Sequence, residues 1–305
     1  MNQFAKYILS VFVAVFLAQS LVCQTTLNVV SKKTVQEFPF KKEDILIIRA
    51  EKGVIDIKPW QNNKVKLEMN IVVKNENLNI AKMELDYVSW NSNQKINVLQ
   101  LNNKINIPNN GELKSIIRVE YLLWLPQGAK LSINNSFGQV KITNLSFSGQ
   151  IDIQYCDLIL DKTHGFVEVS SNVGDLNISE SGGSYNITSK YSTVNINKPS
   201  GNYKLESTYG NVKTTIDQDF STLNIISERC DVTILNKNCI ETDFKLEAKY
   251  STIKLNESCY IKKKSILEKK TSGTHPNETN TFKYSLPESS HSILIKSSYG
   301  AINME

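Results

Sequence analysis

A repeated segment of about 18 residues constrains this chain more than any other feature of its sequence. The motif Ser-x-Tyr-Gly-x-Val and close variants of it recur along the C-terminal two-thirds. Its aromatic position, taken as the reference, falls at Phe137, Tyr155, Val173, Tyr191, Tyr209, Arg229, Tyr250 and Tyr299, in steps of 18, 18, 18, 18, 20, 21 and 49 residues. Such a period indicates stacked units, because one unit cannot bury its own apolar face.

Residues around the reference position alternate between apolar and polar, which is typical of strands with one face inward. Four positions before the reference there is an unbroken aliphatic column: Ile133, Ile151, Val169, Ile187, Leu205, Ile225, Leu246 and Ile295. The inward residues stand at even separations before the reference and at odd separations after it, so the chain must turn between the two strands. We place this sharp corner at the small residues that follow the reference, among them Gly138, Cys156 and Gly210. These patterns predict an all-β fold, a parallel β-solenoid of about 18 to 21 residues per coil with an N-terminal β-rich cap.

The chain divides into three predicted parts. Residues 1–23 are expected to be a signal peptide, because Lys6 precedes an apolar run at 7–17 that is too short for a membrane span. Residues 24–130 are expected to form the β-rich cap, with a first coil near 46–57. Residues 131–305 are expected to hold the solenoid repeats, with a polar loop at 268–280. The mature protein is therefore expected to be exported, to the periplasm, the cell surface or the medium, without a transmembrane segment.

Three elements together resemble the putative adhesin family of exported bacterial β-solenoid proteins, which is related to auto-transporter adhesin head domains. They are the Ser-x-Tyr-Gly-x-Val register, the segment around Gly53, and the element at 125–128 that leads into Ser136-Phe137-Gly138. The resemblance covers most of the mature chain. It implies an exported β-solenoid, while the adhesive role of that family is itself an inference.

One candidate binding site is a ladder along the corner, formed by Tyr191, Tyr209, Arg229, Tyr250 and Tyr299. Their rings could stack against sugars. The alternative is that the rings pack on one another and hold the corner, with Arg229 between Tyr209 and Tyr250.

Other candidates favour structural roles. Two positions before the reference, an inward column of serines consists of Ser171, Ser189, Ser207, Ser227 and Ser297. Because no histidine shares their register to act as a base, a hydrogen-bonded ladder of hydroxyl groups is favoured over a nucleophile. Asp157, Asp175 and Asp231 favour turn formation over calcium binding or acid–base chemistry. Trp60, Trp90 and Trp124 are expected to be buried between the cap and the first coil. We predict no metal site and no cofactor.

The cysteines suggest one disulfide. Cys239 and Cys259 are 20 residues apart, about one coil, and are the candidate pair. Cys156 and Cys230 share the corner column but are four coils apart, so they are not expected to pair.

Taken together, the sequence predicts a noncatalytic exported envelope or surface protein with an adhesin-like, scaffold or binding role. The alternative is a carbohydrate-active β-helix enzyme, a polysaccharide lyase or hydrolase, for which no cluster of acids and bases is found. The formal charge of +5 is too small and dispersed to predict nucleic-acid binding. The expected partners are a glycan or an envelope protein. The last coil, 293–304, is expected to leave an open edge for self-association.

Overall fold

The computed structural model describes residues 27–256, 266–272, 279–285 and 289–305. The predicted signal peptide, 1–23, lies outside these described residues. The first part of the chain forms β1 (Asn28–Pro39), β2 (Ile45–Glu51), β3 (Gly53–Pro59), β4 (Lys64–Asn75), α2 (Leu78–Leu85), β5 (Val88–Lys95), β6 (Val98–Ile105), the 3-10 helix η1 (Pro108–Asn110) and β7 (Ile116–Leu125).

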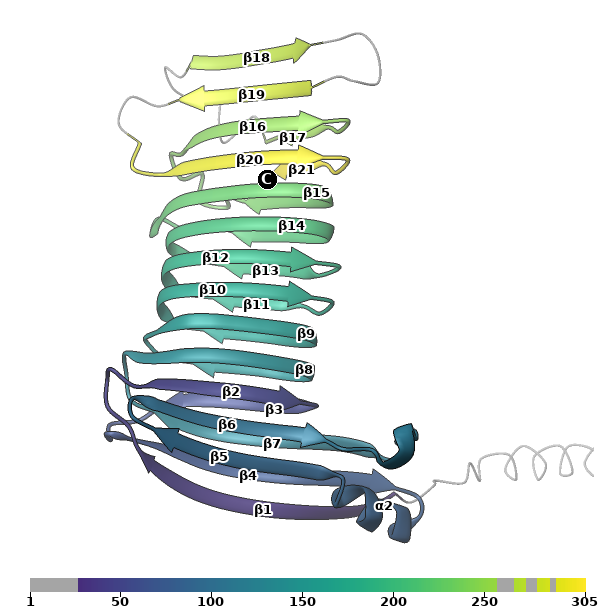
Figure 1. Cartoon of the computed structure of the whole chain (residues 1–305). Helices are drawn as coiled ribbons and strands as arrows, with labels where there is room; N and C mark the ends of the chain where they lie inside the picture. The colour runs from purple at the N-terminus through teal and green to yellow at the C-terminus, as the bar shows by residue number, and fades with distance from the viewer. Residues whose placement is uncertain (1–26, 257–265, 273–278, 286–288) are drawn as a thin grey trace, which may run out of the picture.

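The repeats form β8 (Ala129–Thr143), β9 (Phe147–Asp161), β10 (His164–Asn172), β11 (Leu176–Ser179), β12 (Gly182–Lys190), β13 (Thr193–Asn197), β14 (Ser200–Thr215) and β15 (Phe220–Leu235). The last part forms β16 (Asp243–Lys249), β17 (Ile253–Leu255), β18 (Ile266–Ser272), β19 (Thr279–Ser285), β20 (Ser292–Ser298) and β21 (Ile302–Met304). Figure 1 shows these strands lying one above another in a tall stack, with α2 beside the N-terminal strands.

The predicted register of the repeats is confirmed. Ile187 pairs with Leu205, and Leu205 pairs with Ile225, each between parallel strands. The whole aliphatic column that contains them is buried. A second column, which begins at Val140 and Leu158, faces it from the strand segments after the corner and is buried through most of its length. The dry interior between the two columns is the hydrophobic core that holds neighbouring repeats together.

The predicted fold class, a parallel β-solenoid, is wrong. The strands β9, β10, β12, β14, β13 and β11 pair in that order, all in parallel, and β11 pairs back with β9. They form a closed six-stranded parallel barrel to which many further strands are added. The closure arises because β9 and β14 each include residues on both sides of a left-handed corner, at Tyr155 and Tyr209, so that each pairs on both sides of the core. The stack also ends in antiparallel pairs, which a uniform parallel winding does not contain.

The N-terminal strands continue the register of the repeats and then depart from it. Leu46 pairs with Leu131 and Ile55 pairs with Val140, so the segment near 46–57 has the predicted inward register. Beyond it, β7 is parallel to β3, whereas β4 is antiparallel to both β7 and β1. The helix α2 begins at an Asn77 side chain that accepts hydrogen bonds from two backbone N–H groups of its first turn.

The C-terminal repeat does not lie at an open edge. The strand β20 pairs with β15 on one side and with β16 on the other, and β21 lies in the same way between β15 and β17. The last repeat of the sequence therefore occupies the space between the two repeats that precede it (Figure 1). This arrangement removes the open edge that we predicted at 293–304.

The parts of the predicted polar loop that the structure describes, 268–272 and 279–280, lie in β18 and β19. That pair continues the sheet beyond β16, since β19 is antiparallel to β16.

The corner is built differently from the prediction. The left-handed backbone conformation occurs at the reference position itself, for example at Tyr209 with φ 57° and Arg229 with φ 54°. The following residue is small because the backbones approach closely there: a Cβ atom on Gly210 would lie 2.0 Å from the carbonyl oxygen of Ser192. In spatial order glycines alternate with cysteine or serine in this column, which runs Gly138, Cys156, Gly174, Ser192, Gly210, Cys230 and Gly300.

Candidate functional site: the corner ladder

Nine residues form a continuous column at the corner, which we call the corner ladder. Their spatial order is Lys52, Phe137, Tyr155, Val173, Tyr191, Tyr209, Arg229, Tyr299 and Tyr250. All nine have φ between 52° and 63°, the left-handed region that costs a side chain about 1–2 kcal/mol. Six of the nine are aromatic. Because a left-handed residue interrupts the alternation of the strand, these side chains point out of the core.

The rings of the corner ladder stack on one another. The ring centroids of Phe137 and Tyr155 are 4.9 Å apart, and those of Tyr191 and Tyr209 are 5.0 Å apart. The rings of Tyr299 and Tyr250 are 4.8 Å apart. This spacing equals the distance between neighbouring parallel strands, which is why equivalent side chains come into contact. The structure thus brings all five predicted ladder residues to one edge of the stack.

Arg229 does not lie between the residues that the sequence suggested. Its guanidinium carbon lies 5.1 Å from the ring centroid of Tyr209 and 5.9 Å from that of Tyr299. It also donates a hydrogen bond to the Tyr209 hydroxyl. Tyr299 replaces Tyr250 as its neighbour because the last repeat lies between β15 and β16. The cation therefore links two groups of rings, which makes the ladder continuous there.

Sequence reasoning omitted Phe137 and Tyr155 from the candidate site. Both stand in the same reference column and are exposed in the structure, Tyr155 by 48%. Their place in the aligned repeats could have identified them as members of the ladder. The ladder is interrupted only by Val173, whose side chain is half-buried. Tyr155 stacks on Phe137, and Tyr191 stacks on Tyr209, so the two rings that flank Val173 are each covered on the far side.

The acidic residues at the corner hold the turns of neighbouring repeats. Asp157 Oδ1 accepts a hydrogen bond of 3.0 Å from the backbone N–H of Asp175. In the same way, Asp231 Oδ1 accepts one of 2.8 Å from Ala301. Asp157 and Asp231 thus lie at turns, as the sequence favoured, but the hydrogen bonds of their carboxylates join neighbouring repeats rather than closing their own turn. Within the described ranges, no group of three or more histidine, cysteine or acidic residues could hold a metal ion.

The inward serine column is buried, as predicted. Ser189 Oγ donates a hydrogen bond of 3.0 Å to Ser207 Oγ, and Ser297 Oγ donates to the carbonyl of Gly300 at 2.8 Å. Ser171 Oγ and Ser227 Oγ are buried without a hydrogen-bond partner among the described residues. Among the described residues the predicted hydroxyl ladder is thus formed only between Ser189 and Ser207.

The cysteines fall into two groups. Cys156 and Cys230 are free and buried, which agrees with the prediction that they do not pair. Burial raises the pKa of the Cys156 thiol. Cys239 is disulfide-bonded. Cys259 lies outside the described residues, so its pairing with Cys239 stays a prediction that non-reducing mass spectrometry would check.

The three tryptophans are half-buried, so the burial that we predicted for them is incomplete. Trp60 donates a hydrogen bond of 2.6 Å to the carbonyl of Lys64, and the Lys66 ammonium lies 4.5 Å from the ring centroid of Trp124. Trp90 packs against the core. They lie on N-terminal strands or next to them, where the outer face of the sheet meets solvent.

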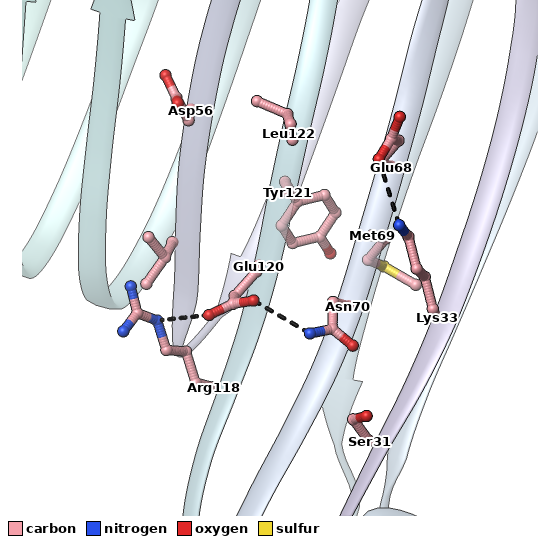
Figure 2. Close-up of a pocket in the computed structure, with 11 residues that line it drawn as sticks. Ser31, Lys33, Asp56, Glu68, Met69, Asn70, Arg118, Glu120, Tyr121 and Leu122 are labelled. Carbon is pink, nitrogen blue, oxygen red and sulfur yellow. Dashed lines mark hydrogen bonds and ion pairs between the residues drawn. The ribbon is translucent and has the colours of Figure 1, made fainter.

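An open depression of about 510 Å³ lies on the N-terminal sheet, over β1, β4, β7 and β3 (Figure 2). Four of its five charged side chains pair with one another: the Lys33 ammonium lies 3.5 Å from the Glu68 carboxylate, and Arg118 Nε lies 3.3 Å from the Glu120 carboxylate. The fifth, Asp56, pairs with Lys58, 3.1 Å away, which does not line the depression. The hydrogen bond from Lys66 lowers the pKa of Glu68. We therefore regard it as a paired outer face of the sheet rather than as a catalytic centre.

Comparison with known proteins gives two solved structures. One is described as a putative cell adhesion protein from Clostridium sporogenes, at 14% identity and a TM-score of 0.27, covering 90% of this chain and 99% of that one. The other is described as a putative adhesin from Bacteroides fragilis, at 10% identity and a TM-score of 0.33, covering 90% and 97%. No family model matches the chain, and no curated protein matches it.

In the part of the chain that the structure describes, no helix is long and apolar enough to cross a membrane.

Proposed function

We propose that this chain is a noncatalytic, adhesin-like binding protein of the cell envelope or surface, and that it recognises glycans with the corner ladder. The observation that carries the proposal is the exposed column of stacked aromatic rings. Tyr191 is 58% exposed and Tyr299 is 55% exposed. Contiguous apolar groups on a soluble surface commonly mark a binding site. Tyrosine suits sugars in particular, because its ring packs on C–H groups while its hydroxyl bonds to polar ones.

The turn alone does not require these rings. A left-handed residue is cheapest as glycine or asparagine, so each tyrosine adds about 1–2 kcal/mol of backbone cost. Stacking returns about 0.5–1.5 kcal/mol for each pair of rings. The six rings form three stacked pairs, so stacking returns less than the six left-handed aromatic residues cost, and they bring no net gain in folding free energy. A binding role supplies a reason for their presence that folding energetics do not.

The enzyme alternative has less support. A glycan-cleaving site needs a general acid and a second carboxylate or base at a defined separation. The corner carboxylates Asp157 and Asp231 instead accept hydrogen bonds from backbone N–H groups of adjacent repeats. His291 is also engaged, since its Nδ1 lies at hydrogen-bond distance from the carbonyl of Phe220.

A glycan array tests the proposal directly. Residues 24–305 are applied to the array, together with a variant that carries Tyr191→Ala, Tyr209→Ala and Tyr299→Ala. The matched control is Phe166→Ala, which removes an aromatic ring that is 49% exposed but lies outside the ladder. At about 0.5–1.5 kcal/mol per ring, the triple variant should bind at least tenfold more weakly, while the control binds as the parent does.

Three results would count against this function. If the parent retains no glycan, the proposal fails. If the triple variant binds as well as the parent, the ladder is not the contact surface. If polysaccharides are cut into products, the enzyme alternative is favoured instead.

A further inference from the structure

We infer that the interruption of the corner ladder at Val173 is a binding slot for a single pyranose ring, held between Tyr155 and Tyr191. We call Tyr155, Val173 and Tyr191 the Val173 slot. This inference rests on the proposed function and names where on the ladder one sugar unit is bound.

The backbone places Val173 midway between the two tyrosines. Its carbonyl accepts a hydrogen bond of 3.1 Å from the N–H of Cys156, the residue that follows Tyr155. Its own N–H donates one of 3.0 Å to the carbonyl of Lys190, the residue that precedes Tyr191. Tyr155 and Tyr191 therefore occupy equivalent positions two repeats apart, and the repeat between them carries no ring at the ladder position.

The width of the slot follows from the spacing of the ladder. Neighbouring rings elsewhere in it are 4.8 to 5.0 Å apart. Two such steps separate Tyr155 from Tyr191, so their ring centres are about 10 Å apart. A pyranose chair placed midway, with its C–H faces toward the two tyrosines, would lie about 5 Å from each, close to the spacing of the rings that already stack. The slot has room for one such ring and no more.

The walls of the slot are held in place before any ligand binds. Phe137 supports Tyr155 from behind and Tyr209 supports Tyr191, each with its ring nearly parallel to its partner at 6° and 8°. Fixed side chains lose little conformational entropy on binding, which favours affinity. Both walls are also half exposed, so a ring can enter from solvent.

Val173 is a costly choice for its position. Its φ of 63° is the highest among the ladder residues, and a branched Cβ makes the left-handed conformation especially unfavourable. Glycine would turn the chain at lower cost, and tyrosine would complete the stack. Valine does neither, but its short apolar side chain leaves the space open and gives it a dry floor.

Exposed polar residues beside the slot explain why we choose a sugar over an aromatic ligand. Gln154, Asn172 and Lys190 precede the three slot positions and are exposed. Their amide and ammonium groups offer donors and acceptors in reach of ring hydroxyls, which a plain aromatic ring lacks. A pyranose ring has apolar C–H faces for the two tyrosines and hydroxyl edges for these polar groups.

The decisive variant is Val173→Tyr, because it fills the slot with a ring that stacks on both walls. The probes are methyl glucopyranoside, methyl galactopyranoside and methyl mannopyranoside, with phenol as the aromatic alternative. Binding is measured by changes in tyrosine NMR signals. At least one glycoside should bind the parent chain, and Val173→Tyr should weaken that binding at least tenfold. Tyr191→Ala, which removes one wall, is the second variant in case Val173→Tyr does not fold.

The controls separate this inference from the wider proposal. Phe166→Ala, which removes an exposed ring outside the ladder and the slot, should bind the glycoside as the parent does. Equal binding by the parent and by Val173→Tyr or Tyr191→Ala would overturn the slot, while array binding that is lost in the triple ladder variant would still support the function. Binding of phenol without any glycoside would overturn the sugar assignment. Failure of the parent on the whole array would overturn both proposals.

Discussion

Gly210→Ala tests how closely neighbouring repeats approach at the corner. A Cβ atom on Gly210 would lie 2.0 Å from the carbonyl oxygen of Ser192 and 2.9 Å from its carbonyl carbon. Non-bonded heavy atoms need about 3.5–4.0 Å, so the two backbones must separate by more than about 1 Å. No change of rotamer relieves this contact, because both atoms are tied directly to the backbone.

The cost can be worked out from the contacts that such a separation breaks. The hydrogen bond of 3.3 Å from the N–H of Asn211 to the carbonyl of Ser192 would be lost. Leaving the carbonyl of the buried Ser192 unpaired costs about 1–3 kcal/mol, and loosening the Tyr191–Tyr209 ring stack costs about 0.5–1.5 kcal/mol. The entropy that alanine removes from the unfolded chain offsets only about 0.4–1 kcal/mol. The free energy of unfolding should therefore fall by about 0.5–4 kcal/mol.

Urea unfolding followed by circular dichroism measures this loss. The matched control is Gly111→Ala, where the backbone is extended at φ −69° and a Cβ atom would lie 3.3 Å from the carbonyl oxygen of Pro108. It should cost less than about 1 kcal/mol. Adding Ser192→Gly to Gly210→Ala should not restore stability, because the obstacle is a carbonyl oxygen. Equal stability of the two single alanine variants would refute the reasoning.

Three further predictions concern buried polar groups. Glu84 is 1% exposed, and its carboxylate accepts hydrogen bonds of 2.8 Å from the backbone N–H groups of Lys114 and Ser115. Glu84→Ala should therefore lower the free energy of unfolding, measured in urea, by about 2–4 kcal/mol. The control Lys82→Ala, at an exposed position of the same helix, should change it by less than about 0.5 kcal/mol. Burial raises the pKa of three tyrosines, Tyr121, Tyr185 and Tyr203. Since their folded pKa exceeds the unfolded value of about 10, their contribution to stability is complete below that pH and is lost as the pH rises through the folded values. Absorbance at about 295 nm should therefore show these phenols ionising together with loss of structure, and ionisation near pH 10 in the intact fold would contradict this. The buried thiols of Cys156 and Cys230 should react with a thiol reagent only after denaturant is added, and rapid labelling of the native protein would show that the corner is open.

Much of the local structure could be predicted from the pattern of residues. The columns that contain Ile187 and Val140 are buried because their apolar side chains recur at matching positions of each repeat. The same alignment identified the ladder residues, including Phe137 and Tyr155, which were not carried into the candidate site. The alternation of polar and apolar residues also placed the segment near 46–57 in register with β8. These features depend on which side of a strand each residue faces, which is a local property.

The conformation of the corner was placed one residue too late. A small residue after Tyr209 suggested that Gly210 turns the chain, whereas Tyr209 itself is left-handed and Gly210 is small because Ser192 lies against it. A glycine in the sequence shows that its position needs a small residue. It does not show whether the reason is a close contact with another repeat or a left-handed backbone, because both favour glycine.

By itself, the sequence determined which side chains are buried, how often they recur and which residues share the corner. Only the tertiary structure decided that β20 lies between β15 and β16, that Arg229 meets Tyr299, and that the strands close into a barrel. The physical reason is that a periodic pattern records the burial of a side chain, while the neighbour that buries it is chosen by how the whole chain folds back. Repeats with the same inward pattern can exchange places without changing that pattern.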